Sequence, residues 1–449
     1  VVLSVGLGIN NLNKLSGNGK AGDINKISGS GDAQIKYNDG ILGERKDSDR
    51  RDYGEAYRDF GPVPMPELGE AYEASDSSFE MPSEYIKTSD EVPWDSYEVE
   101  ARAGTLTAGE WRDTDNLADW YKLVRDNKWY DYAEERKIFS NKAVTVKVTD
   151  EGAACFNVKV ELKDGNKVIA KGQTNIKGEA YLFYNVDGGK ANPSAVTVNG
   201  KDYSLSTDYI EIEAKNCGIE LKAIDLMYMV DTTGSMGDEL NYIKAELVDM
   251  VSRIAEKDQA VSIRVSVNFY RDEGDDYIVK YFDFREDINA CYELIKNEKA
   301  DGGGDTPEAV HTALDNAVNG HTWREDALKL CFLVLDAPPH SEEEIQGINA
   351  DLRETFIKAA EAGIRFIPVM CSGADQATEY LLRSLAAITN GTFIFLTDDS
   401  GIGNPHIETS VGDYNVEKLN DCMVRVVCEF AGFEYTAPAQ QNQQSQNSN

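Results

Sequence analysis

Residues 224–240, IDLMYMVDTTGSMGDEL, decide the fold of the second half of this 449-residue chain. An apolar run ends at Asp231, and a short turn that contains Thr233, Gly234 and Ser235 leads into an amphipathic segment. A buried strand, a polar turn and a helix in this order are typical of a parallel sheet with crossover helices. Ligands of such sheets bind at the carboxyl ends of the strands. The sequence therefore predicts an α/β domain with a binding site at this turn.

The same alternation of strands and helices continues to residue 432. Apolar runs predict further strands at residues 261–270, 328–336, 364–370 and 392–398, with an edge strand at 277–284. Amphipathic segments predict the intervening helices at residues 239–257, 287–299, 307–318, 351–363, 377–391 and 416–432. We therefore assign residues 221–432 to one domain with a mostly parallel sheet flanked by helices.

The turn after the first strand carries possible metal ligands. Asp231 supplies a carboxylate, Thr233 and Ser235 supply hydroxyls, and Gly234 lets the loop bend so that these oxygens converge. Hard oxygen ligands are those that Mg²⁺, Ca²⁺ and Mn²⁺ take in proteins. Alone, an Asp at a strand end followed by Ser or Thr is equally typical of a helix N-cap. Other parts of the chain must decide between the two interpretations.

Two later segments add oxygen ligands. The Gly-rich loop GGGDTPEAV contains Thr306, and LVLDAPPH contains Asp336 at the end of another predicted strand. Together with D-x-T-G-S at residues 231–235, they resemble the metal-ion-dependent adhesion site (MIDAS) of von Willebrand factor type A (VWA) domains. The segments NFYRDEGDDY (268–277) and LAAITNGTFIFL (385–396) are similar to VWA domains of the hemicentin and alpha-kinase-associated kind. The resemblance covers residues 224–432.

This resemblance implies a Rossmann-like fold and a bound Mg²⁺, or Mn²⁺ or Ca²⁺. The implied metal-site residues are Asp231, Thr233, Ser235, Thr306 and Asp336. Asp305 beside Thr306 is an alternative ligand, and an extra carboxylate would bind the cation more tightly but attract an acidic partner less. One open coordination position would take a Glu or Asp of a protein or matrix ligand. The implied function is cation-dependent adhesion without catalysis.

Composition excludes some partners. The chain has 79 Asp and Glu against 45 Lys and Arg, a formal net charge of −34, and this argues against nucleic acid or an anionic membrane as the main partner. The seven cysteines include no C-x-x-C pair, so a zinc knuckle or a thioredoxin motif is not indicated. Cys155 and Cys217 flank a β-rich stretch, and whether they pair is left open.

The first 140 residues divide into two parts. Residues 1–103 are rich in Gly, Asp, Ser and Glu, which predicts a largely disordered acidic leader. Its opening run VVLSVGLGI is too short to span a bilayer and is either the remnant of a signal peptide or anchor, or an ordinary terminus. Residues 104–140 have helical character and many aromatic residues, and predict a linker that packs against a neighbouring domain. The Gln/Asn-rich tail at 433–449 is expected to be disordered.

Residues 141–220 alternate with period two and carry frequent turn signals, which predicts a small antiparallel β-sandwich. The segment TNIKGEAYL (174–182) resembles the turn of transthyretin-like, carboxypeptidase-regulatory-type sandwiches, with Asn175 in place of the usual Asp. Such modules are usually spacers. The region around GTLTAGEW (104–111), followed by a sandwich and a VWA domain, also resembles bacterial envelope proteins, which implies a secreted or cell-surface location.

Two other functions fit parts of the pattern. Ser235 lies between a strand and a helix, as the nucleophile of a hydrolase does, with Asp336 and His406 as the only suitable partners in sequence order. Thr233 stands where the first glycine of a nucleophile elbow belongs, which disfavours this interpretation. In a purely structural envelope or stalk protein, the metal would only stabilise the fold.

Overall fold

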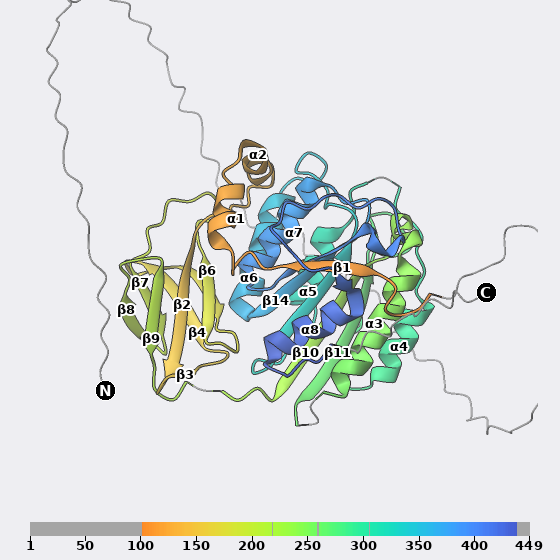
Figure 1. Ribbon diagram of the computed structural model, residues 1–449. Helices are drawn as coiled ribbons and strands as arrows, with labels where there is room; N and C mark the ends of the chain where they lie inside the picture. Colours follow the sequence, from red (N-terminus) through yellow and green to blue (C-terminus); the bar gives the residue numbers. More distant parts are fainter. Residues whose placement is uncertain (1–100, 218, 258–259, 305, 438–449) are drawn as a thin grey trace, which may run out of the picture. The chain divides into compact units, whose positions relative to one another are not determined.

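The computed structural model describes residues 101–217, 219–257, 260–304 and 306–437. The expected acidic leader, its opening apolar run and most of the Gln/Asn-rich tail lie outside the described residues. The described part contains one eight-stranded sheet flanked by helices and two four-stranded sheets (Figure 1).

The eight-stranded sheet has the order β12-β11-β10-β13-β14-β15-β1-β16. Its strands are β12 (Val279–Lys280), β11 (Ser262–Tyr270), β10 (Ala223–Asp231), β13 (Leu328–Leu335), β14 (Ile364–Met370), β15 (Phe393–Leu396), β1 (Thr107–Trp111) and β16 (Glu417–Lys418). The five strands from β11 to β15 in this order are parallel, and β12, β1 and β16 pair antiparallel at the edges. The prediction of a mainly parallel sheet flanked by helices is confirmed, including the short edge strand β12.

Both faces of this sheet are covered, which explains why its central strands β10, β13 and β14 are mostly apolar. Side chains alternate between the faces, so that Leu226 and Tyr228 of β10 join one core cluster and Met227 and Met229 join the other. One face packs against α3 (Leu240–Ala255), α4 (Ile288–Asn297) and α8 (Leu419–Ala431), and the other against α5 (Val310–Asn319), α6 (Ile348–Ala362) and α7 (Gln376–Ile388) (Figure 1). None of the described helices combines the length and the apolar character that crossing a bilayer requires.

The N-terminal part of the described chain belongs to the same layered unit. β1 pairs antiparallel with β15, and α1 (Leu117–Leu123) and α2 (Asn127–Arg136) follow it. Trp120 and Trp129 pack against Tyr380 of α7, with ring centroids 6.2 and 6.0 Å from it. The stretch predicted as a helical linker therefore opens with a strand, which was missed because TAGEW is short and contains a glycine.

A buried group of charges joins this segment to α7. The guanidinium of Arg383 donates two hydrogen bonds to Asp113, at 3.0 and 2.6 Å, and one to Glu379 at 3.0 Å. All three side chains are at most 2% exposed. The guanidinium of Arg383 thus pairs with both carboxylates in the interior, and of their oxygens only Glu379 Oε2 is buried without a hydrogen-bond partner.

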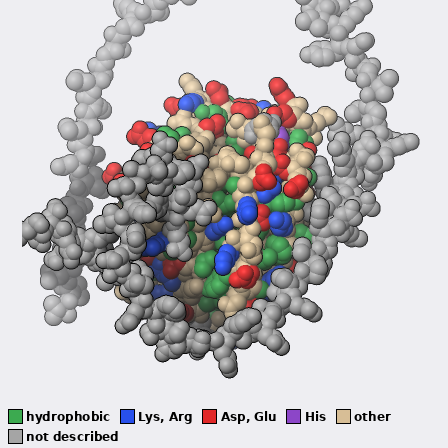
Figure 2. All heavy atoms as spheres, turned by 90° about the vertical axis from the view of Figure 1, so that its right-hand side faces the viewer, with side chains coloured by type: hydrophobic (Ala, Val, Ile, Leu, Met, Phe, Trp, Pro, Cys, Tyr) green, Lys and Arg blue, Asp and Glu red, His purple; other side chains and the backbone are tan. Residues whose placement is uncertain are grey.

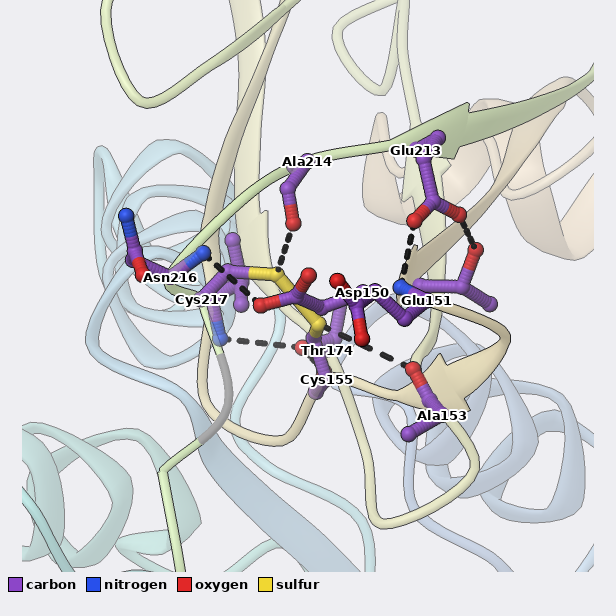
Figure 3. Close-up of a disulfide and its surroundings, with 11 residues drawn as sticks. Asp150, Glu151, Ala153, Cys155, Thr174, Glu213, Ala214, Asn216 and Cys217 are labelled. Carbon is purple, nitrogen blue, oxygen red and sulfur yellow. Dashed lines mark hydrogen bonds between the residues drawn. A yellow bond between two sulfur atoms is a disulfide. The ribbon is translucent and has the colours of Figure 1, made fainter.

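Residues 143–213 form the two four-stranded sheets. One contains β2 (Ala143–Asp150), β3 (Ala153–Ala154), β6 (Glu179–Phe183) and β9 (Tyr209–Glu213), and the other β4 (Lys159–Asp164), β5 (Lys167–Gln173), β7 (Ala195–Val198) and β8 (Lys201–Ser204). Side chains of both sheets share a core cluster of their own. Cys155 and Cys217, whose pairing was left open, form a disulfide beside Thr174 (Figure 3).

The turn that resembles transthyretin-like modules is closed by side chains. The Asn175 side-chain oxygen accepts hydrogen bonds from the backbone of Lys177 and Glu179, at 2.8 and 2.9 Å, so it takes the place of a carboxylate. Gly178 has a φ of +76°, and a Cβ there would lie 2.4 Å from the carbonyl oxygen of Val148. The relationship of this unit to transthyretin-like modules stays a prediction.

Candidate metal centre

Asp231 is the last residue of β10 and has no exposed surface. Its Oδ1 accepts hydrogen bonds from the backbone nitrogen and the hydroxyl of Thr233, at 2.9 and 2.7 Å. The Thr233 hydroxyl also lies 3.2 Å from that of Ser235, which is exposed at the start of the 3₁₀ turn η1 (Gly234–Asp238). The first three predicted ligands therefore lie together, but Asp231 Oδ2 is buried without a partner.

Asp336 directly follows β13, which pairs with β10, so both aspartates lie at the same edge of the sheet. Asp336 is 5% exposed, and its Oδ1 is buried without a hydrogen-bond partner. Burial and the neighbouring Asp231 carboxylate raise the pKa of Asp336 to about 7. Burial also raises the pKa of Asp231 to about 6, although the hydrogen bonds from Thr233 favour its charged form.

The Gly-rich loop approaches these residues through its glycines. Gly302 and Gly303 have φ angles of +76° and +65°, and the carbonyl of Gly302 accepts a hydrogen bond from the nitrogen of Gly234 at 3.1 Å. A Cβ added at Gly303 would lie 3.3 Å from the Cβ of Thr233. Only a residue without a side chain allows this approach with ordinary clearance.

The loop presents a different residue to the site from the one predicted. Thr306 is exposed, and Asp305 lies outside the described residues. Glu308 is instead 2% exposed, with its Oε1 3.0 Å from a Cβ built on Gly303 and its Oε2 buried without a partner. Burial, followed by the charges of Asp231 and Asp272, raises the pKa of Glu308 to about 9. Sequence reasoning missed Glu308 because a Glu at the start of a helix is ordinarily a solvated residue that favours the helix dipole.

The site as a whole groups three buried carboxyl side chains with no described positive side chain paired to them. Asp231, Asp336 and Glu308 each have a buried oxygen without a partner, and no Lys or Arg forms a salt bridge with them in the described ranges. Buried carboxylates in this state are costly unless a cation pairs with them. Carboxylate and hydroxyl oxygens are the ligands that a hard divalent cation takes. The donor set therefore fits such an ion.

Carboxylates alone do not form the site. Among the described residues, no group of three or more His, Cys, Asp or Glu side chains is placed to hold a metal ion. A metal at Asp231 and Asp336 therefore depends on the hydroxyls of Thr233 and Ser235 and on water.

Figure 2 shows one face of the molecule, where acidic side chains gather along the upper rim and Lys and Arg lie nearer the middle.

The hydrolase triad is not assembled. His406 uses both ring nitrogens, Nε2 toward Glu239 Oε1 at 3.1 Å and Nδ1 toward Asp398 Oδ1 at 2.8 Å. Burial lowers the pKa of His406, but these hydrogen bonds and charges outweigh burial and raise it above its ordinary value. Both ring nitrogens of His406 are thus engaged by carboxylates and not by Ser235. The arrangement of Ser235, Asp336 and His406 as a hydrolase triad is therefore not favoured by these hydrogen bonds.

Comparison with known proteins places a VWA domain in this part of the chain. Residues 225–406 match the family model "von Willebrand factor type A domain". Domains of this type commonly mediate protein–protein interactions, are generally not enzymes and often bind a divalent metal at a MIDAS. The matched span includes the residues around the candidate metal centre, whereas β1, β16 and α8 lie outside it.

Two curated proteins are similar over a limited region. An alpha-protein kinase of Dictyostelium discoideum is 26% identical over 147 residues, or 32% of this chain and 22% of the kinase. An ariadne-like RING finger protein of Acanthamoeba polyphaga mimivirus is 34% identical over 120 residues, or 26% of this chain and 11% of that protein. The chain thus spans less than a quarter of the length of either relative.

Among solved structures, BatB from Bacteroides thetaiotaomicron is similar at 11% sequence identity and a TM-score of 0.31. The match covers 46% of this chain and 99% of BatB.

Proposed function

We propose that this protein binds a divalent cation, Mg²⁺ or else Mn²⁺ or Ca²⁺, and uses it to bind a protein partner without catalysis. The cation would be held by Asp231, Thr233, Ser235 and Asp336, directly or through water. The observation that carries the proposal is the set of buried carboxylate oxygens without partners at the ends of β10 and β13. A divalent cation supplies the positive charge that this arrangement lacks.

The partner would contribute the last ligand. Ser235 is exposed, so an ion at the hydroxyls of Thr233 and Ser235 can be reached from solvent. A Glu or Asp side chain of a protein or extracellular-matrix ligand is the oxygen donor that suits an open position on such an ion. The chain's own residues would orient the cation, and the backbone hydrogen bond from Thr233 would keep Asp231 in place.

A secreted or cell-surface location, in a bacterial envelope, is part of the same proposal. The Cys155–Cys217 disulfide supports it, because disulfides persist in oxidising compartments. The two four-stranded sheets at residues 143–213 would then act as a transthyretin-like spacer that carries the VWA domain. The competing possibility is a structural stalk protein in which the metal only stabilises the fold.

Isothermal titration with Mg²⁺ tests the proposal, with the wild type compared with Asp231→Ala. We expect saturable binding to the wild type and none to the variant, because Asp231 is the central carboxylate of the site. Equal behaviour of the two proteins would contradict the proposal. Thermal melts with Mg²⁺ and with EDTA then measure how far the metal stabilises the fold.

A further inference from the structure

The Gly-rich loop delivers a carboxylate to the candidate metal centre where the sequence predicted a hydroxyl. Thr306 is exposed, whereas Glu308, two residues later, is 2% exposed and has a buried oxygen without a partner. A backbone hydrogen bond anchors the loop at Glu308. The nitrogen of Glu308 donates to the carbonyl of Pro338 at 3.0 Å, in the segment that follows Asp336.

Glu308 Oε2 has no hydrogen-bond partner among the described residues. The Gly-rich loop brings this side chain beside Thr233, because a Cβ built on Gly303 would lie 3.0 Å from Glu308 Oε1 and 3.3 Å from the Cβ of Thr233. Asp272 is paired with His340, at 2.7 Å from Nε2 to Oδ1, so this histidine is already engaged. A cation from outside the chain would pair with the ionised form of such a buried carboxyl group.

We infer that Glu308 is a third carboxylate of the metal centre that tightens cation binding and weakens the attraction of an acidic partner. The inference rests on the proposed cation site. Because the carboxylates of Asp231, Asp336 and Glu308 do not converge as one ligand group, Glu308 acts on the cation through its charge and through bridging water. With the cation bound and all three side chains ionised, the site has a net charge of −1, whereas two ionised aspartates alone would leave it neutral. Glu308 therefore competes with the carboxylate of a partner.

The main test is the affinity of the full chain for Mn²⁺, measured by electron paramagnetic resonance of the free ion. We expect Glu308→Gln, which keeps the shape and removes the charge, to weaken Mn²⁺ binding by about 10- to 100-fold, as loss of an outer-shell partner does. Glu343→Gln removes the same charge from an exposed side chain in the segment after Asp336 and should change the affinity less than twofold.

The second readout is acetate, used as the simplest carboxylate. Proton relaxation of water on bound Mn²⁺ reports the acetate concentration that displaces this water. We expect Glu308→Gln to need less acetate than the wild type, because the repelling charge is gone. A thermal melt in EDTA checks that the variant is folded, and there Glu308→Gln should melt at or above the wild-type temperature.

Three outcomes separate failure of this inference from failure of the proposed function. If Asp231→Ala abolishes Mn²⁺ binding while Glu308→Gln leaves affinity and acetate response unchanged, the role of Glu308 is wrong and the cation site stands. A greater loss in Thr306→Val than in Glu308→Gln would likewise overturn it in favour of the threonine. If the wild type does not bind Mn²⁺ at all, both proposals fail.

Discussion

Arg383 and Asp231 are both fully buried charges of the same α/β unit, but their surroundings differ. Arg383 donates to two carboxylates, those of Asp113 and Glu379, so each charge has a partner of the opposite sign. Asp231 instead faces Asp336 and Glu308, and every member of this group keeps a buried oxygen without a partner. The first group contains its own cation, although Glu379 Oε2 is buried without a hydrogen-bond partner, whereas the second group has no Lys or Arg paired with it in the described residues.

The comparison separates buried charge that supports the fold from buried charge that serves binding. Pairing offsets the cost of desolvation around Arg383, and this joins the N-terminal segment to α7. Around Asp231 no cationic side chain of the described residues offsets this cost, and the pKa values of Asp336 and Glu308 are raised to about 7 and about 9. Burial also raises the pKa of Glu379, but there the charge of Arg383 opposes the rise. A buried group of carboxyl side chains without a cation is thus an indication of a missing ligand.

The largest effect is expected when the ion-paired group around Arg383 is broken. Arg383→Met would leave Asp113 and Glu379 buried without a cation, which should lower the free energy of unfolding by about 3–5 kcal/mol. Urea denaturation measures this loss. Arg253→Met is the matched control, because its partners Asp249 and Asp421 lie nearer the surface, and it should cost no more than about 1 kcal/mol. Equal losses in the two variants would show that burial does not decide how much these ion pairs contribute to stability.

A smaller change in the free energy of unfolding, of the opposite sign, is expected in the candidate metal centre. Asp336→Asn removes one of the mutually repelling carboxylates and should raise the free energy of unfolding in EDTA at pH 8 by about 1–2 kcal/mol. The sign follows from its raised pKa, because the ionised form is less stable in the folded chain than in the unfolded chain. With saturating Mg²⁺ the order should reverse, since the wild type gains the cation. Destabilisation by Asp336→Asn in EDTA would show that the site is not strained.

The smallest effect concerns His406, whose Nε2 lies 3.1 Å from Glu239 Oε1 and whose Nδ1 lies 2.8 Å from Asp398 Oδ1. Its pKa is raised in the folded chain, so its contribution is complete below the unfolded value near 6.5 and is lost as the pH rises through the folded value. Between pH 6 and pH 8 in Mg²⁺, the wild type should therefore lose up to about 1 kcal/mol more stability than His406→Gln. Parallel pH profiles for the two proteins would exclude this role.

Apolar periodicity was sufficient to predict the core of the fold. The parallel strands β10, β13, β14 and β15 are mostly apolar runs buried on both faces of the sheet, so the sequence marks them clearly. β1 was missed because it is five residues long and its partner β15 lies far along the chain. Its place in the sheet depends on tertiary pairing that no local pattern records.

The site was predictable only in part, for a similar reason. Asp231, Thr233 and Ser235 are close in sequence, and the structure brings them together, with Asp336 on the neighbouring strand. The orientation of the Gly-rich loop depends on positive φ angles at Gly302 and Gly303, which turn Glu308 rather than Thr306 inward. Spacing alone does not show which side of such a loop is buried.

The place of β1 in the sheet has a consequence for synthesis of the protein. The side chains of Thr107 and Thr397, which hydrogen-bond at the end of this strand pair, are 290 residues apart in the chain. At ordinary rates of translation β1 leaves the ribosome roughly 15–60 s before its partner strand exists. A strand that remains unpaired for so long risks joining other chains. Its brevity, its glycine and the charge of Glu110 limit this risk, so the features that hide β1 from sequence analysis also protect the nascent chain.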